Sequence, residues 1–143
     1  MQDIDEITQA LYQSVSFKKG TRPDLQRLKT LFYEGGKLAN CNGNLPQEFS
    51  VQQFIDVVEG RMKTGNLVFF QEREVASRTE IFGKIAQRFS TYEAFLEEDG
   101  AEPAATGINS IQFIQVEGCW YVYSMVWNDQ AEGRIIPAKY FEP

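Results

Sequence analysis

The stretch 107–127, GINSIQFIQVEGCWYVYSMVW, constrains the fold more than any other part of this chain. Two runs rich in β-branched and aromatic residues, 108–116 and 119–126, are separated by Glu117 and Gly118. A two-residue link that contains glycine supplies the positive φ that a tight hairpin turn needs. The stretch therefore predicts an antiparallel β-hairpin.

The side chains of this hairpin alternate between two faces, and neither face is polar. One face of its second strand would carry Trp120, Val122, Ser124 and Val126. The other would carry Cys119, Tyr121, Tyr123, Met125 and Trp127. If helices of the same chain cover the first face, Trp120 faces the core or a pocket. Tyr121, Tyr123 and Trp127 would then form an exposed aromatic patch, which usually marks an interface.

Composition and charge limit the class of protein. The chain has 143 residues, of which 43% are hydrophobic and 24% charged, as expected for one globular domain spanning residues 1–143. Its formal net charge is −6, and its lysines and arginines are scattered along the chain. We therefore expect neither a nucleic-acid partner nor an anionic membrane surface as a partner.

Targeting signals and cysteine usage favour a cytoplasmic protein. The amino-terminal segment MQDIDEITQALYQ is acidic and amphipathic, unlike a signal peptide. No apolar run approaches the ~20 residues of a membrane span. Cys41 and Cys119 lie far apart and form no CxxC motif, so we expect two unpaired thiols in a reducing compartment.

Two helices are predicted in the first quarter of the chain. The first has Asp3 as its cap and Glu6 as the reciprocal partner, and it closes at 18–20. The second begins at 22–24, where proline suits the first helical position, and it stops at the glycine pair 35–36.

A third helix has the clearest local signature. Ser50 and Gln53 form a capping box, and Phe49 and Phe54 can form a hydrophobic staple around it. Gly65 ends this helix. After it, the period of the apolar residues changes from helical to that of strands.

The predicted strands are 37–40, 67–79, 85–96, 108–116 and 119–126. Helices followed by longer strands are typical of an α+β fold with the helices gathered on one side of the sheet. We therefore predict a strongly curved antiparallel sheet wrapped around three amino-terminal helices.

This order of elements, together with the hairpin and the segments RPDLQRLKTLF, FGKIAQRFSTYEAF and IIPAKYF, resembles the SnoaL-like branch of the nuclear-transport-factor-2-like superfamily. The resemblance covers essentially the whole chain. It implies a cystatin-like α+β cone with an internal pocket, and a homodimer packed through the outer sheet face. The same cone serves isomerases, dehydratases, epoxide hydrolases, polyketide cyclases and transport adaptors, and many members have no assigned function, so fold alone does not define an activity.

The chain contains no histidine. This excludes Ser-His, Cys-His and His-carboxylate mechanisms and the usual zinc sites, so no metal is expected. No glycine-rich phosphate loop or dinucleotide fingerprint is present, so no cofactor is expected either. Any acid–base chemistry must use carboxylates, tyrosine, lysine or a water polarised by arginine.

The first candidate pocket residues lie on strand 85–96. Alternation groups Arg88, Ser90 and Tyr92 on one face, where the hydroxyls could contact a ligand and Arg88 could hold an anion or enolate. The alternative is that Arg88 packs its stem at the rim and Tyr92 belongs to the core. Glu93 could act as a general base in an apolar cone, but it points away from Tyr92 unless a bulge intervenes.

Three further residues complete the set of pocket candidates. Arg73, in the charged run 72–74, either pairs with Glu93 across the sheet or lies between two acids, which resembles superfamily epoxide hydrolases. Asn109 and Gln112 lie on opposite faces of the hairpin, so whichever points inward can form a hydrogen-bonding wall.

Three functions follow from these observations. The protein binds a small apolar molecule in the cone, or is a histidine-independent lyase- or isomerase-type enzyme, or is a protein-interaction module that uses the outer sheet face. The sequence does not decide whether it is an enzyme. A pocket with two or more converging polar groups, one of them desolvated, favours the enzyme, and a purely apolar cavity favours binding.

Overall fold

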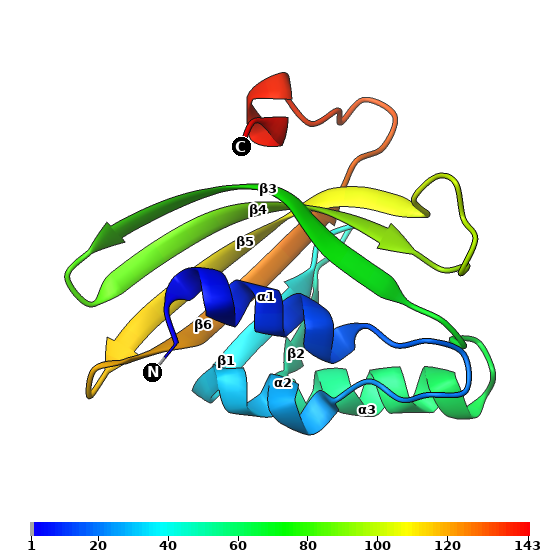
Figure 1. Cartoon of the computed structure of the whole chain (residues 1–143), viewed down its shortest axis with the longest axis horizontal. Helices are drawn as coiled ribbons and strands as arrows, with labels where there is room; N and C mark the ends of the chain where they lie inside the picture. Colours follow the sequence, from blue (N-terminus) through cyan, green and yellow to red (C-terminus); the bar gives the residue numbers. More distant parts are fainter. Residues whose placement is uncertain (1) are drawn as a thin grey trace.

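The computed structural model describes residues 2–143 and confirms the predicted α+β class. Its helices are α1 (Ile4–Val15), α2 (Leu25–Leu31), α3 (Val51–Lys63) and the short 3-10 helix η1 (Ala138–Phe141). Its strands are β1 (Phe32–Asn40), β2 (Gln47–Ser50), β3 (Gln71–Phe82), β4 (Ile85–Phe95), β5 (Ala105–Val116) and β6 (Cys119–Asp129). Figure 1 shows α1, α2 and α3 on one side of a curved sheet and η1 on the other.

The strands within residues 2–143 form a six-stranded mixed sheet in the order β2-β1-β6-β5-β4-β3. Four of the five neighbouring pairs are antiparallel, whereas β1 and β6 run parallel. The predicted all-antiparallel sheet is therefore wrong at this one pair. The physical reason is that β1 and β6 are far apart in the chain, and alternation within a strand does not say which strand becomes its neighbour.

The central hairpin forms as predicted. Glu117 and Gly118 have φ values of 51° and 81°, so both turn residues are left-handed, as a two-residue hairpin turn requires. β5 begins at Ala105 and β6 continues to Asp129, so both strands are longer than predicted.

Both predicted capping boxes are present. Asp3 caps α1 and Ser50 caps α3, each accepting a hydrogen bond from the backbone N–H three residues later. The rings of Phe49 and Phe54 pack edge to face with centroids 5.9 Å apart, as the hydrophobic staple predicts. The Ser50 capping box and the Phe49–Phe54 contact fix the start of α3 beside β2.

Two boundaries before α3 differ from the prediction. α2 ends at Leu31, and Phe32 begins β1 although it continues the apolar stripe of the helix. The glycine pair 35–36 therefore lies inside a strand instead of ending a helix. β2, Gln47–Ser50, was not predicted because its side chains are mostly exposed and give no alternating pattern.

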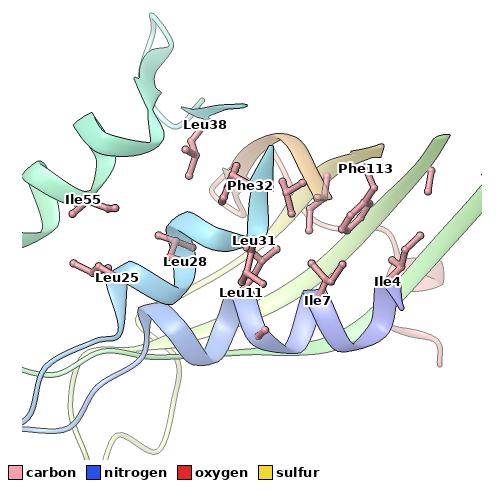
Figure 2. Packing of buried hydrophobic residues seen from close by; sticks show 14 residues of the cluster. Ile4, Ile7, Leu11, Leu25, Leu28, Leu31, Phe32, Leu38, Ile55 and Phe113 are labelled. Carbon is pink, nitrogen blue, oxygen red and sulfur yellow. The ribbon is translucent and has the colours of Figure 1, made fainter. Parts of the chain in front are cut away.

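The hydrophobic core lies between the concave face of the sheet and the helices. Ile4, Ile7 and Leu11 project from one face of α1 toward Phe113 of β5 (Figure 2). Side chains with almost no exposed surface in this core include Leu28, Leu38, Ile55, Ile111, Phe113 and Val122. Each contributes roughly 1.5–3 kcal/mol by burial, so this core holds the helices against the sheet.

The carboxyl-terminal segment covers part of the convex face. The Thr91 hydroxyl donates to the carbonyl oxygen of Tyr140 at 2.6 Å, and the rings of Phe89 and Tyr140 lie 5.6 Å apart. β4 is thus covered here, whereas the Tyr123 side chain of β6 stays exposed.

Candidate functional site

Two β-bulges decide which side chains reach the concave face. On β6, Tyr123 has no partner on β5, so the alternation shifts by one residue. The side chains of β6 that face the helices after this bulge are those of Met125, Trp127 and Asp129. On β3, Val75 is the unpaired residue, and Glu72 and Glu74 before it face inward.

A cavity of about 390 Å³ lies between the concave face, α1 and α3, a size typical of small-molecule sites. Its apolar walls include Leu11, Phe49, Phe54, Phe70, Met125 and Trp127. Its polar lining consists of Tyr12, Asn40, Asn42, Gln47, Arg61, Glu72, Tyr92, Asn109 and Asp129. The exposed lining residues, such as Val57 and Arg61 on α3, mark its opening.

One side of the cavity, here called the polar wall, consists of Tyr12, Glu72, Tyr92, Asn109 and Asp129. The Asp129 carboxylate accepts two hydrogen bonds, from the Tyr92 hydroxyl to Oδ1 and from the Asn42 amide to Oδ2 at 2.9 Å. By contrast, no residue in the range 2–143 hydrogen-bonds the Glu72 carboxyl group. Asp129 is therefore the fixed carboxylate of the pair, and Glu72 is the one available to a ligand.

The surroundings of Glu72 change its protonation. Burial raises the pKa of the Glu72 carboxyl to about 8, and the negative charge of Asp129 acts in the same direction. Burial also raises the pKa of the Tyr92 hydroxyl, and its hydrogen bond to Asp129 raises it further. At neutral pH, Glu72 is thus mostly a neutral acid, able to give a proton to a ligand.

A hydrogen-bond chain connects the polar wall to a buried ion pair. Arg88 donates to Glu74 through Nη2 at 2.6 Å and through Nε at 3.0 Å, so Glu74 is an ionised acceptor. Ser90 must therefore donate to Glu74, at 2.5 Å, and Tyr12 must donate to Ser90, at 2.6 Å. Asn109 donates to the Tyr12 oxygen at 3.0 Å. The Tyr12 hydrogen is thus committed to Ser90, and its oxygen serves as an acceptor.

Among the residues predicted for the pocket, Tyr92 and Asn109 line the cavity. Arg88 and Ser90 lie on the same inward face of β4, as alternation predicts, but they belong to the chain of contacts behind Tyr12 and not to the cavity lining. The Arg88 side chain is only 5% exposed. Burial lowers the pKa of its guanidinium, but hydrogen bonds to Glu74 and Asp5 outweigh this effect and raise it.

The other four pocket candidates do not line this cavity. Arg73 and Glu93 form an ion pair of 2.8 Å across β3 and β4 on the outer face, which is the alternative that the sequence offered. Gln112 is exposed because it alternates out of phase with Asn109. Trp120 packs against the hydrophobic core before the bulge in β6 and does not line the cavity.

The predicted aromatic patch on the outer face keeps two of its three members. The side chain of Tyr123 is 51% exposed, and Tyr121 packs edge to face on Tyr33 with centroids 6.0 Å apart. The outward prediction for Trp127 is wrong, since the bulge turns this side chain into the cavity, where its ring packs on Phe54 at 6.1 Å. The homodimer stays a prediction.

Sequence reasoning missed Tyr12, Glu72 and Asp129. For Glu72 a signal existed, because an outward Arg73 places its two neighbours inward. Tyr12 lies one helical turn after Thr8, and both are buried next to the apolar stripe of α1. For Asp129 no signal existed, since it lies beyond the predicted end of the strand and after the bulge.

Gly107, paired with Tyr92 across β4 and β5, leaves the space that the Tyr92 ring occupies. A Cβ atom here would lie 2.6 Å from both the Tyr92 Cζ atom and the backbone oxygen of Asn128. We expect Gly107→Ala to push Tyr92 away from Asp129 and to lower the free energy of unfolding by about 1–3 kcal/mol in urea titrations. Gly43→Ala is the control, since its Cβ would meet nothing closer than 3.6 Å. Equal losses in both variants would contradict this.

Metal-ligand groups, disulfides and membrane-spanning helices were also sought among residues 2–143. No group of three or more Cys, Asp or Glu side chains within residues 2–143 is arranged to hold a metal ion. Cys41 and Cys119 are both free thiols. No helix in that range is long and apolar enough to cross a membrane.

No family model and no curated protein matches the sequence. Solved structures do match. A cystatin-like protein of unknown function from Nostoc punctiforme superposes with a TM-score of 0.69 at 15% identity, covering 89% of this chain and 88% of the other. An NTF2-like protein from Streptomyces avermitilis, provisionally assigned as a dehydratase, gives 0.66 at 12% identity over 90% and 94%.

A third match is a protein from Novosphingobium aromaticivorans, provisionally assigned as an aromatic ring hydroxylase, with a TM-score of 0.69 at 14% identity over 90% of this chain and 87% of the other. At such identities the likeness concerns the fold. The chain therefore has the cystatin-like fold of the nuclear-transport-factor-2-like (NTF2-like) proteins.

Proposed function

We propose that the protein binds a small, mainly apolar organic molecule in the cavity and that Glu72 exchanges a proton with it. The observation that carries this proposal is the Glu72 carboxyl group, which faces an apolar cavity without a hydrogen-bond partner among residues 2–143 and lies near the charged Asp129. A cavity with converging polar groups, one of them desolvated, favours an enzyme over a passive binding protein. The proposal is thus a histidine-independent acid–base enzyme.

The polar wall supplies the parts that such chemistry needs. A pKa of about 8 places Glu72 near neutral pH, where a carboxyl group can both give and accept a proton. Asp129 sets this value in part through its charge, and Tyr92 and Asn42 hold Asp129 in place. A ligand that fills the cavity displaces water and strengthens these electrostatic effects.

The fold neighbours support a reaction class only in part. The Streptomyces avermitilis protein is provisionally assigned as a dehydratase, and loss of water from an alcohol requires a proton to reach the leaving hydroxyl group. The Novosphingobium protein carries a different provisional assignment, so the fold does not select the substrate. The proposed proton transfer rests on the residues of this chain.

Hydrogen–deuterium exchange tests the proposal without knowledge of the natural substrate. Aryl methyl ketones of one to three rings are incubated with the protein in D2O, and deuterium in the methyl group is measured by mass spectrometry. Ionised Glu72 should remove a methyl proton, so the rate should rise with pH and level off above a pH of about 8. Glu72→Gln should lower the rate by about 10²-fold or more.

Two controls accompany this experiment. Ala105→Phe adds a ring to the cavity lining and should abolish exchange, whereas Ala138→Phe on the exposed η1 should not. Exchange that persists in Glu72→Gln would contradict the role of Glu72. Exchange that persists in Ala105→Phe would contradict the role of the cavity.

A further inference from the structure

The hydrogen-bond directions in the polar wall leave acceptors facing the cavity. The Tyr12 hydroxyl donates to Ser90, because Ser90 is itself committed to the ionised Glu74. The Tyr92 hydroxyl donates to Asp129. Neither tyrosine hydrogen is therefore available to a ligand, and the Tyr12 oxygen already accepts from Asn109. The carboxylate oxygens of Glu72 and Asp129 are the acceptors that remain in the polar wall.

The charged residues of the cavity lining also favour a ligand that donates hydrogen bonds. Glu72 and Asp129 are the acidic residues of its lining, and Arg61 is the basic residue, exposed at the opening on α3. Glu72 has no cationic partner within residues 2–143, in contrast to Glu74 and Glu93, which are each paired with an arginine. A ligand that carries a positive charge and hydrogen-bond donors complements such a wall, whereas an anion is repelled by it.

The apolar part of the cavity lining accepts the body of such a ligand. Trp127, Phe54 and Phe49 form a row of edge-to-face contacts, with centroids 6.1 Å and 5.9 Å apart. Aromatic rings bind apolar groups, and their faces also attract a cation. A cavity of about 390 Å³ has room for a molecule of about two fused rings.

We propose that the cavity selects small hydrophobic amines, with the protonated amino group bound between the carboxylates of Glu72 and Asp129, and the apolar body against Trp127 and Phe54. This inference deepens the proposed function, since it assumes that the cavity is a small-molecule site. It adds the chemical class of the ligand. The ammonium group takes the place of the proton that Glu72 holds in the empty cavity.

Three ligands of one shape test the inference by isothermal titration calorimetry with the full chain. They are 2-naphthylmethylamine, 2-naphthylmethanol and 2-naphthoic acid. At pH 7 the amine should bind at least about tenfold more tightly than the alcohol, because its hydrogen bonds are to charged groups, and the acid should not bind. An alcohol that binds as tightly as the amine would overturn the inference and leave the proposed small-molecule site intact. Binding of none of the three would overturn both.

The pH dependence gives a second, independent readout. Glu72 faces Asp129 on β6, Tyr92 on β4 and Tyr12 on α1, with Arg61 of α3 at the opening. Because the ammonium group competes with the proton on Glu72, the Kd of the amine should fall up to about tenfold per pH unit between pH 6 and 8. The Kd of the alcohol should show no such fall.

Calorimetry in several buffers, on the parent chain and on variants, tests whether the proton released on amine binding comes from Glu72. Titrations of the amine in buffers of different ionisation enthalpy should show release of roughly one proton at pH 6 from the parent chain and none from Glu72→Gln. Glu34→Gln, exposed on β1, is the matched control and should behave like the parent. Proton release that persists in Glu72→Gln, or an amine Kd independent of pH in the parent, would overturn the inference.

Discussion

Arg88→Met should lower the free energy of unfolding by about 3–5 kcal/mol, because it leaves the largely buried Glu74 carboxylate without its cation. The Arg88 and Glu74 side chains are 5% and 19% exposed, so solvent can replace only a small part of the lost interaction. Methionine keeps most of the apolar volume of the arginine stem, so the loss reports mainly the charge. Urea unfolding at pH 7, followed by circular dichroism, measures it.

A double variant separates the charge from the packing. Arg88→Met combined with Glu74→Gln removes both charges, so it should recover most of the stability that the single variant loses. Asp5→Asn is the second control, since the Asp5 side chain is 78% exposed and its ion pair with Arg88 should contribute at most about 1 kcal/mol. A loss in Arg88→Met no larger than in Asp5→Asn would contradict this account of the buried pair.

The ion pair also matters for the cavity that it does not line. Glu74 fixes the direction of the Ser90 hydroxyl, and Ser90 in turn fixes that of Tyr12. A change behind the polar wall therefore alters which hydrogen-bonding group Tyr12 presents to a ligand. Such coupling through a hydrogen-bond chain places Arg88 among the residues that position the site without touching the ligand.

The parts of the fold that sequence reasoning predicted are those set by local rules. Asp3 and Ser50 begin their helices because their side chains satisfy backbone N–H groups a few residues away. The Glu117–Gly118 turn follows from local backbone geometry in the same way. The inward face of β4 with Arg88, Ser90 and Tyr92 was equally predictable, because no bulge interrupts its pairing with β5.

The candidate site was less predictable because it depends on pairing between strands. The unpaired residue Tyr123 moves Trp127 and Asp129 from the convex to the concave face, and nothing in the local sequence marks that position as a bulge. The parallel pairing of β1 with β6 is likewise set by the packing of distant segments. Glu72 was the exception, since pairing Arg73 with Glu93 on the outer face would have placed its neighbour Glu72 inside by alternation.

Glu72→Gln should stabilise the protein at pH 8 while leaving its stability at pH 4.5 nearly unchanged. The pKa of Glu72 is about 8 in the folded chain and 4.5 in its ordinary state, so between these values the folded state holds a proton that the unfolded state has lost. The free energy of unfolding of the parent should therefore fall by up to about 1.4 kcal/mol per pH unit as the pH rises through this window. In the variant this contribution is absent.

The chain suits this measurement because it has no histidine, so few other groups titrate between about pH 5.5 and 7.5. Urea unfolding of parent and variant at pH 5, 6, 7 and 8 gives the two slopes, and the difference between them isolates Glu72. Glu34→Gln removes an exposed carboxylate on β1 and should keep the slope of the parent. Parallel curves for Glu72→Gln and the parent would contradict a proton held on Glu72, and with it the acid–base role proposed for the cavity.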